Sequence, residues 1–426
     1  MRIKKRSYFE ILLLLLIVAF VGQGTNLVDA VISLNFRWIL LLLMLLYLIA
    51  TKKFLNNAAS HIMMILISYQ VWCITTTVWS GVPLLSFMKS AMFVLVSITL
   101  VSAGKEWVRR NGACRALDVF LLIVVVTLVS GVLGDYAHVN DSLNVYNNLG
   151  RDANEFGFLA ALSAPLLLWR MYHSWNKLNM RLVYGLLLFI CVYFLARSFS
   201  RSAALMASSI ALFFVFSLSL QKKLVLLFAG TLILLMSMLF MAPLIIGFAQ
   251  LHFYKSYTDV DALKSRQQAW HKSYIQAVKG GWLGGGYGAT IGDNSFVMKG
   301  LNARGYGREK ANSQLAIIEE TGIVGFVFYC ALLIIFFTKG IRCFLRMSGE
   351  EKVAMGLILG TLVGLLLESV AEGWWDAPGG QEFTSFWVLF GLAMGVMSLE
   401  KRKMRYGYSS MEAPPREVLS ESPATS

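Results

Sequence analysis

Apolar runs long enough to cross a lipid bilayer recur along almost the whole chain, and this repetition limits the folds open to it. With 57% hydrophobic and 15% charged residues, the chain differs from an ordinary soluble domain, which carries about 25% charged residues. A helical span needs about 20 mostly apolar residues. Twelve runs qualify, approximately residues 8–22, 33–50, 61–79, 84–103, 116–134, 154–171, 182–200, 202–219, 224–248, 322–338, 353–371 and 383–399. The sequence therefore predicts an all-α polytopic membrane protein with about twelve transmembrane helices.

Lysine and arginine are distributed unequally between the segments that connect these runs. Alternate segments, beginning with the N-terminus, carry basic clusters such as those at 2–6, 105–115 and 401–405, whereas the short segments between them carry few cations. Basic residues favour the cytoplasmic side, so both termini are expected to be cytoplasmic. The first run reads as a retained anchor rather than a signal peptide. The net charge of +14 then reflects topology, and we expect no nucleic acid as a partner.

One long polar segment, residues 249–321, interrupts the apolar runs between the ninth and the tenth. Its position predicts a large, partly helical loop on the outer side of the membrane. The expected organisation is a nine-span N-terminal membrane region (1–248), this loop (249–321), a three-span C-terminal membrane region (322–400) and a disordered cytoplasmic tail (401–426). The five cysteines form no CxxC motif or Cys/His cluster, so no metal or other cofactor is expected.

The loop contains an amphipathic pattern followed by a glycine-rich run. Arg266, Trp270 and Tyr274 recur at four-residue spacing, which predicts a helix that lies on the membrane and ends at the next glycine pair. The run GGWLGGGYG (280–288) suits either a close backbone approach to a ligand or a tight return turn. The aromatic residues of this part suit either stacking on sugar rings or anchoring at the membrane interface; they are Trp270, Trp282 and Tyr287.

Several cations lie on the side of the membrane that the orientation bias disfavours. Arg197 and Arg201 flank the short outer turn RSFSRS, and Lys89 lies one to two turns inside the fourth run. Guanidinium groups bind phosphate with two hydrogen bonds and stay charged when partly desolvated, so these residues predict an outward-facing anion site. Snorkelling to the interface is the alternative for Lys89. The loop adds further candidates, Arg266, Arg304 and Arg308, whereas its lysines, including Lys310, are expected to form a solvated face.

Taken together, these motifs resemble the O-antigen ligase/polymerase superfamily of membrane glycosyltransferases. The resemblance rests on the RxxxW helix with its glycine run, the S-R-S step at 200–202, NSQLAIIEETGIVG at 312–325 and DANEFGFLAAL at 152–162. The twelve runs and the position of the long loop also match. The likeness covers most of residues 1–400, and the order and sidedness of the motifs are more specific than any one of them.

The resemblance implies a GT-C-like fold and a metal-independent, inverting transfer of glycans from undecaprenyl diphosphate at the outer face of the bacterial inner membrane. Arg201 and Arg266 are implied to hold the diphosphate, with Arg197 as a third candidate. Lys89, Arg304, Arg308 and Asn312 are further substrate-binding candidates. The implied acceptor is a lipid-linked repeat unit or lipid A core, and a chain-length regulator is a candidate partner.

One departure from the family concerns the group that activates the acceptor hydroxyl. Ligases of the family carry a histidine directly before the asparagine of this motif, and this chain has Ala311 before Asn312. An alanine cannot accept a proton, so another base is needed. The candidates are His271, Glu319, Glu320, Glu368 and Glu372. The last two are expected to share a helical face with Asp376 next, while Glu319 and Glu320 have an alternative role in neutralising loop arginines.

The leading functional hypothesis is a polysaccharide polymerase that moves a growing glycan from one polyprenyl diphosphate onto another lipid-linked repeat unit. The missing ligase histidine favours this over the ligase alternative, in which lipid A core is the acceptor. O-antigen, capsule and exopolysaccharide assembly all remain open. A membrane transporter is the alternative of a different class, although the sequence has no internal repeat of the kind that many transporters show.

Overall fold

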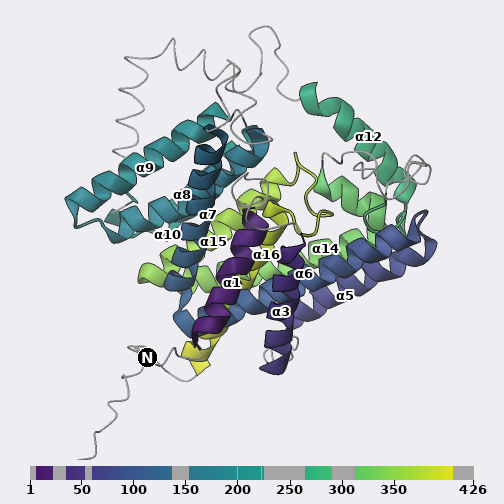
Figure 1. The fold of residues 1–426 in the computed structure, drawn as a ribbon, viewed down its shortest axis with the longest axis horizontal. Coiled ribbons are helices and arrows are strands. Elements are labelled where there is room, and N and C mark those ends of the chain that lie inside the picture. The colour runs from purple at the N-terminus through teal and green to yellow at the C-terminus, as the bar shows by residue number, and fades with distance from the viewer. Residues whose placement is uncertain are drawn as a thin grey trace, which may run out of the picture.

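The computed structural model describes residues 6–22, 35–52, 60–136, 153–198, 200–221, 223–224, 264–289, 310 and 312–405. Within these ranges the chain is helical and contains no strand (Figure 1). The elements are α1 (Arg6–Val21), α3 (Phe36–Ala50), α5 (His61–Thr75), the 3₁₀ turn η1 (Thr76–Trp79), α6 (Pro83–Asn111), α7 (Ala113–Tyr136), α8 (Ala153–His173), α9 (Leu178–Arg197), α10 (Arg201–Ser217), α12 (Lys264–Gly280), α14 (Ser313–Arg346), α15 (Gly349–Glu368) and α16 (Gln381–Arg405).

Five of these helical segments are long and apolar enough to cross a membrane, which identifies an α-helical membrane protein. They are His61–Trp79, Pro83–Asn111, Leu178–Leu195, Ser313–Arg346 and Gln381–Met404. Shorter apolar helices lie at Tyr8–Val21, Phe36–Ala50 and Arg201–Ser217. The predicted run at 224–248 lies outside the described residues, so the expected number of twelve spans remains a prediction.

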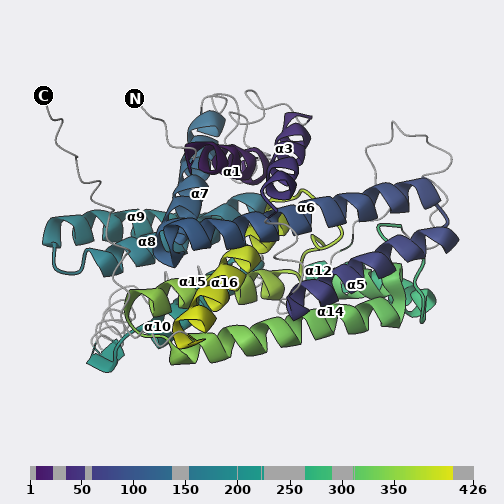
Figure 2. The same cartoon turned by 90° about the horizontal axis from the view of Figure 1, so that it is seen from below.

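Burial separates a central helix from a peripheral one. In α16, 78% of the apolar window is buried, whereas in α9 the value is 6%. The side chains of Leu182, Leu186 and Phe189 on α9 are more than 60% exposed. Figures 1 and 2 both place α9 at the edge of the helix assembly and α16 inside it. Exposed leucine and phenylalanine along a whole helix suit contact with lipid, since a soluble protein rarely exposes so large an apolar surface.

A stripe of small residues brings α10 and α15 into close contact. Gly356, Gly360 and Gly364 recur every fourth residue and so share one face of α15. A Cβ atom on Gly364 would lie 2.8 Å from Cγ of Met206, and one on Gly356 would lie 3.1 Å from Cβ of Ser217. This close approach through small residues is typical of helix packing in membranes. Because the contacts move toward the start of α10 as they move toward the end of α15, the two helices are antiparallel.

The central pair α6 and α16 is parallel instead. A Cβ atom on Gly391 would lie 2.6 Å from the carbonyl oxygen of Val101, and one on Gly395 would lie 2.7 Å from Cβ of Val108. Helices α6, α10, α14 and α16 therefore begin, and α15 ends, at one end of the bundle, here named the loop end. The opposite end, where α16 reaches Arg405, is named the tail end.

Two helix boundaries differ from the sequence-based expectation. Helix α14 begins at Ser313, well before the predicted run at 322–338, and it contains a break at Gly322 (φ 69°, ψ −173°). The break coincides with the predicted boundary between loop and membrane region. Helix α15 ends at Glu368, so Glu372 and Asp376 lie in the turn that follows, where the N–H of Glu372 still donates to the carbonyl of Glu368 at 3.0 Å.

Candidate functional site

The glycine run after α12 is built into the break of α14. The N–H of Gly285 donates to the carbonyl of Glu319 at 2.8 Å, and the N–H of Gly286 donates to the carbonyl of Glu320 at 2.9 Å. These two carbonyls belong to the last turn before the break, where a helix has no partners of its own for them. A Cβ atom on Gly284 would overlap the carbonyl oxygen of Glu320. The glycines are therefore required for a close backbone contact inside the protein.

The same run also accepts hydrogen bonds from the first N–H groups of the helix that restarts after the break. The N–H of Ile323 donates to the carbonyl of Gly281 at 3.0 Å, and the N–H of Val324 donates to the carbonyl of Trp282 at 3.3 Å. A Cβ atom on Gly322 would overlap the carbonyl of Trp282. The sequence allowed either a close backbone approach to a ligand or a tight return turn, and these contacts are those of a tight turn. They hold α12 against α14.

The start of α14 holds the turn between α15 and α16 in place. Asn312 caps the helix, since its Oδ1 accepts from the N–H of Leu315 at 2.8 Å, while its Nδ2 donates to the carbonyl of Val370 at 2.9 Å. The hydroxyl of Ser313 donates to the carbonyl of Glu372 at 2.9 Å. Asn312 was predicted to bind substrate. Its contacts position the start of α14 and the turn after α15.

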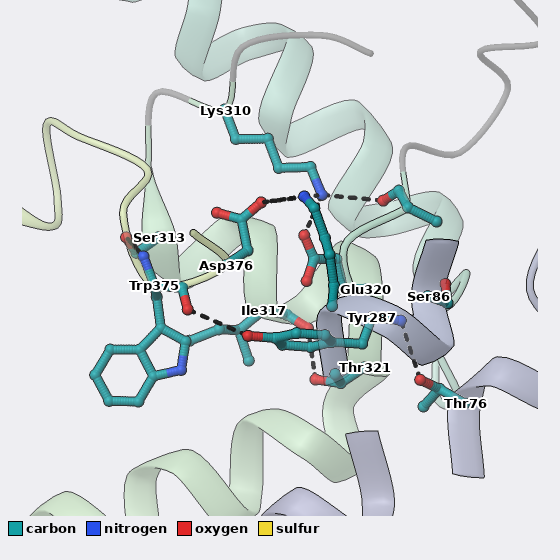
Figure 3. A network of polar contacts seen from close by, with 12 residues as sticks. Thr76, Ser86, Tyr287, Lys310, Ser313, Ile317, Glu320, Thr321, Trp375 and Asp376 are labelled. Atoms are coloured by element: carbon teal, nitrogen blue, oxygen red, sulfur yellow. Dashed lines mark hydrogen bonds and ion pairs between the residues drawn. The ribbon is translucent and has the colours of Figure 1, made fainter. Parts of the chain in front are cut away.

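Four charged side chains from four segments meet at the loop end, and we name them the ion cluster: Lys89, Lys310, Glu320 and Asp376. Figure 3 labels the last three of them. Nζ of Lys310 is paired with Glu320, donates to the carbonyl of Ala289 at 3.0 Å and lies 4.0 Å from Oδ2 of Asp376. Nζ of Lys89 lies 3.9 Å from the same oxygen. The side chains of Lys310 and Glu320 are 5% and 1% exposed, so the cluster lies in a largely water-free region.

The charges of the ion cluster stabilise one another. Burial alone would lower the pKa of Lys310, but the carboxylates of Glu320 and Asp376 raise it above its ordinary value. Burial alone would raise the pKa of Asp376, but the ammonium groups of Lys310 and Lys89 lower it below its ordinary value. Lys310 and Asp376 therefore both stay charged at neutral pH.

The cluster changes three expectations. Lys310 was expected on a solvated face, but it is buried. Glu320 was expected to neutralise a loop arginine or to act as a base, and its partner is Lys310. Lys89 is paired with Asp376 rather than snorkelling to the interface. Sequence reasoning did not identify Lys310 and Asp376 as site residues, because the contacts that bring them together join segments far apart in the chain.

Tyr287 lies under the cluster with its ring enclosed. The side chain is 1% exposed and stacks on Phe93 with ring centroids 5.5 Å apart. Its hydroxyl donates to the carbonyl of Trp375 at 3.3 Å, and its N–H donates to Oγ1 of Thr76 at 3.0 Å. Burial raises the pKa of the phenol, so it stays neutral. Tyr287 thus anchors the glycine run, and its enclosed ring offers no open face to a sugar.

The predicted amphipathic helix is present as α12, which ends at Gly280 as expected. Trp282, two residues after its end, is 70% exposed. Trp270 is partly buried and His271 is exposed on the same helix. The Trp282 ring is therefore accessible, and its stacking on a sugar or anchoring at the membrane interface stays a prediction.

The arginines are only partly described. Arg201 begins α10 and is partly buried. One N–H group of its first turn is capped by Ser200, whose hydroxyl accepts from the N–H of Ala203 at 3.4 Å. The side chains of Arg197 and Arg266 lie outside the described residues, as do Arg304 and Arg308 entirely. The predicted pairing of Arg201 with Arg266 thus remains a prediction.

Two of the motifs behind the resemblance contact each other at α10. A Cβ atom on Gly157, from the DANEFGFLAAL segment, would lie 2.5 Å from Oγ of Ser198 and 2.9 Å from Cβ of Ser200. The start of α8 therefore packs directly against the turn that precedes Arg201. Segments separated by about 40 residues in the chain together fix the position of the first turn of α10.

The remaining predicted carboxylates differ in their surroundings. Glu319 and Glu368 are 0% and 2% exposed, whereas Glu372 is only partly buried. Oε2 of Glu368 is buried and has no hydrogen-bond partner. No group of histidine, cysteine or carboxylate side chains among the described residues has a metal-binding arrangement.

No model of a known protein family matches this chain, and no curated protein matches it. Any statement about its function therefore rests on the residues themselves.

Proposed function

We propose that this protein is a membrane glycosyltransferase that polymerises glycan repeat units carried on polyprenyl diphosphate. It would transfer the growing glycan from one lipid carrier to a hydroxyl of a repeat unit on another. The observation that carries the proposal is the assembly of the motifs at one end of the bundle. The glycine run, the NSQLAIIEETGIVG segment and the S-R-S step all lie at the loop end, although they are distant in the sequence.

The chemistry of the loop end supports a diphosphate as the charged part of the donor. Arg201 lies at the first turn of α10, where backbone N–H groups and the helix dipole favour an anion. A guanidinium group adds a bidentate contact to phosphate. The donor's lipid tail would remain beside apolar helices while its diphosphate meets these groups. Cations that stabilise the departing diphosphate lower the barrier to its release.

The proposal includes an orientation. Twelve spans with both termini in the cytoplasm would put the loop end, with α12 and the ion cluster, at the outer face of the bacterial inner membrane. The antiparallel contact of α10 with α15 and the parallel contact of α6 with α16 agree with this alternation. A GT-C-like arrangement, in which a large outer loop covers a lipid-linked donor, belongs to the same proposal.

The ion cluster would hold the outer loop on the membrane domain during this reaction. It joins α6, Lys310 two residues before Asn312, α14 and the turn after α15. In the proposed reaction, its role is to keep the donor and acceptor sides in a fixed relation, since misplacement by about 1 Å costs about 100-fold in rate.

The test is the surface glycan of a deletion strain that is complemented with variants of the gene. We expect the deletion strain to carry single repeat units on its acceptor, and the wild-type gene to restore long chains. Arg201→Ala should fail to restore them while inserting normally. Arg201→Lys should also be poor because a point charge loses the bidentate contact. Arg342→Ala, an exposed arginine toward the tail end of α14, is the matched control and should restore them.

Other outcomes point to other functions. Full-length chains that accumulate on the carrier lipid in the deletion strain would indicate a ligase. Unaltered glycan together with loss of uptake of a solute would indicate a transporter. Normal chains with Arg201→Ala would contradict the assignment of the site.

A further inference from the structure

Glu368 extends the glycine stripe of α15 to the first turn of α10. It follows Gly364 by four residues and so lies on the same face of the helix. Gly364 faces Met206, and because α10 runs antiparallel, one turn further brings the register to Ser202. Glu368 therefore lies opposite the helix end that carries Arg201.

The Glu368 side chain has a free acceptor in a buried place. It is 2% exposed, and its Oε2 has no hydrogen-bond partner. A buried acceptor without a partner is unfavourable. A carboxylate oxygen without a hydrogen-bond partner has its lone pairs available to accept a proton, which a general base requires.

Two of the other predicted proton acceptors are in less suitable places. Glu320 is already paired with Lys310, so its carboxyl group has a hydrogen-bond partner. His271 is exposed on α12, and the glycine run that follows α12 packs against the break of α14.

We infer that Glu368 is the catalytic base that activates the acceptor hydroxyl; this rests on the proposed glycan transfer. The hydroxyl gives its proton to the Glu368 carboxylate while its oxygen forms a bond to the anomeric carbon of the donor sugar. The bond from that carbon to the diphosphate oxygen breaks, and its electron pair leaves with the polyprenyl diphosphate beside Arg201. Glu368 then releases the proton to water at the loop end. The base and the leaving-group contact thus come from two helices whose register the glycine stripe sets.

The experiment uses the purified full-length protein in lipid vesicles, with lipid-linked repeat units extracted from the deletion strain as donor and acceptor. Glu368→Gln keeps the size and removes the base, so kcat should fall about 100-fold or more while KM changes little. Glu368→Asp should recover part of the rate and change the acid side of the pH–rate profile. Glu350→Gln is the matched control, because Glu350 lies at the other end of α15 with its side chain 54% exposed.

The outcomes separate the two proposals. If the wild-type protein extends the units and Glu368→Gln stays within about tenfold of its kcat, the assignment of the base is wrong while glycan transfer stands. If the wild-type protein does not extend the units, the transfer proposal itself fails. Should Glu368→Gln not fold, the aspartate variant decides, and an unchanged pH–rate profile in that variant overturns the inference.

Discussion

The two ends of the helix bundle hold their charges in different ways. At the loop end, Lys310 and Glu320 are 5% and 1% exposed, and Asp376 and Lys89 join them from other segments. At the tail end, ion pairs such as Lys403 with Glu351 are 41% and 44% exposed.

Some partners at the tail end are neighbours on one helix. Arg109 and Arg110 pair with Glu106 three and four residues away. Glu106 is 4% exposed, whereas Lys403 and Glu351 form an exposed pair of the kind that contributes little to stability. The ion cluster differs from that exposed pair because removal of one of its members leaves another charge buried. Charges at the two ends should therefore respond very differently to substitution.

The largest effect is expected for Lys310→Met. The substitution leaves Glu320 and Asp376 buried with one cation less, which should destabilise the fold by about 3–5 kcal/mol. Chemical unfolding of the purified protein in detergent, followed by tryptophan fluorescence, measures this change. The double variant Lys310→Met/Glu320→Gln leaves Lys89 opposite Asp376 and should recover much of the loss. If the single variant is as stable as the wild type, the buried cluster contributes no more to stability than the exposed pairs at the tail end.

Gly322→Ala should have the next largest effect. The backbone at Gly322 has a φ of 69° and a ψ of −173°, a combination that only glycine adopts readily, and the new Cβ atom would overlap the carbonyl of Trp282. We expect a loss of about 3 kcal/mol, measured by the same unfolding experiment. Gly185→Ala in α9 is the control, since nothing lies within 4 Å of its Cβ position. Equal stability of the two variants would contradict the described break.

The pH dependence of stability should be a smaller effect and should come from the loop end. The lowered pKa of Asp376 means that its stabilisation is present above its ordinary value of 3.8 and is lost as the pH falls through the lower value in the folded protein. The raised pKa of Lys310 means that its stabilisation is present below 10.5 and is lost as the pH rises through its higher folded value. Asp376→Asn should therefore weaken the acid-dependent loss, measured as unfolding midpoint against pH. Glu351→Gln at the tail end should leave the acid profile close to that of the wild type.

The smallest effect is expected for Lys403→Met. Both side chains of its pair with Glu351 are more than 40% exposed, so the change should be below about 1 kcal/mol. The difference from wild type should shrink further at high salt, because salt screens exposed charges. A loss as large as that of Lys310→Met would remove the distinction between the two ends.

Several parts of the fold could be anticipated from local pattern alone. The runs of apolar residues predicted helices that the structure contains, from α1 to α16, apart from the run at 224–248 that lies outside the described residues. The four-residue spacing of Arg266, Trp270 and Tyr274 predicted α12, and the glycine pair predicted its end. These features depend on neighbouring residues within one element, which is why sequence alone is informative about them.

The site could be anticipated only in part. Arg201, Glu320 and Glu368 were named as candidates, but nothing in the local sequence distinguishes Lys310 from the other loop lysines. Its partner Asp376 lies 66 residues further along the chain. The predicted run at 353–371 placed the end of α15 a few residues too late, and Glu372 and Asp376 lie beyond the helix.

The order of amino acids thus specifies a membrane protein of apolar helices with a polar loop, because hydrophobic periodicity and the placement of cations act within short stretches. Which charges are buried together, and which carboxyl group remains without a partner, follows from helix register. That register depends on contacts such as Gly364 with Met206 and Ser313 with Ser369. Such contacts join residues far apart in the chain, and their free energy depends on how whole helices pack.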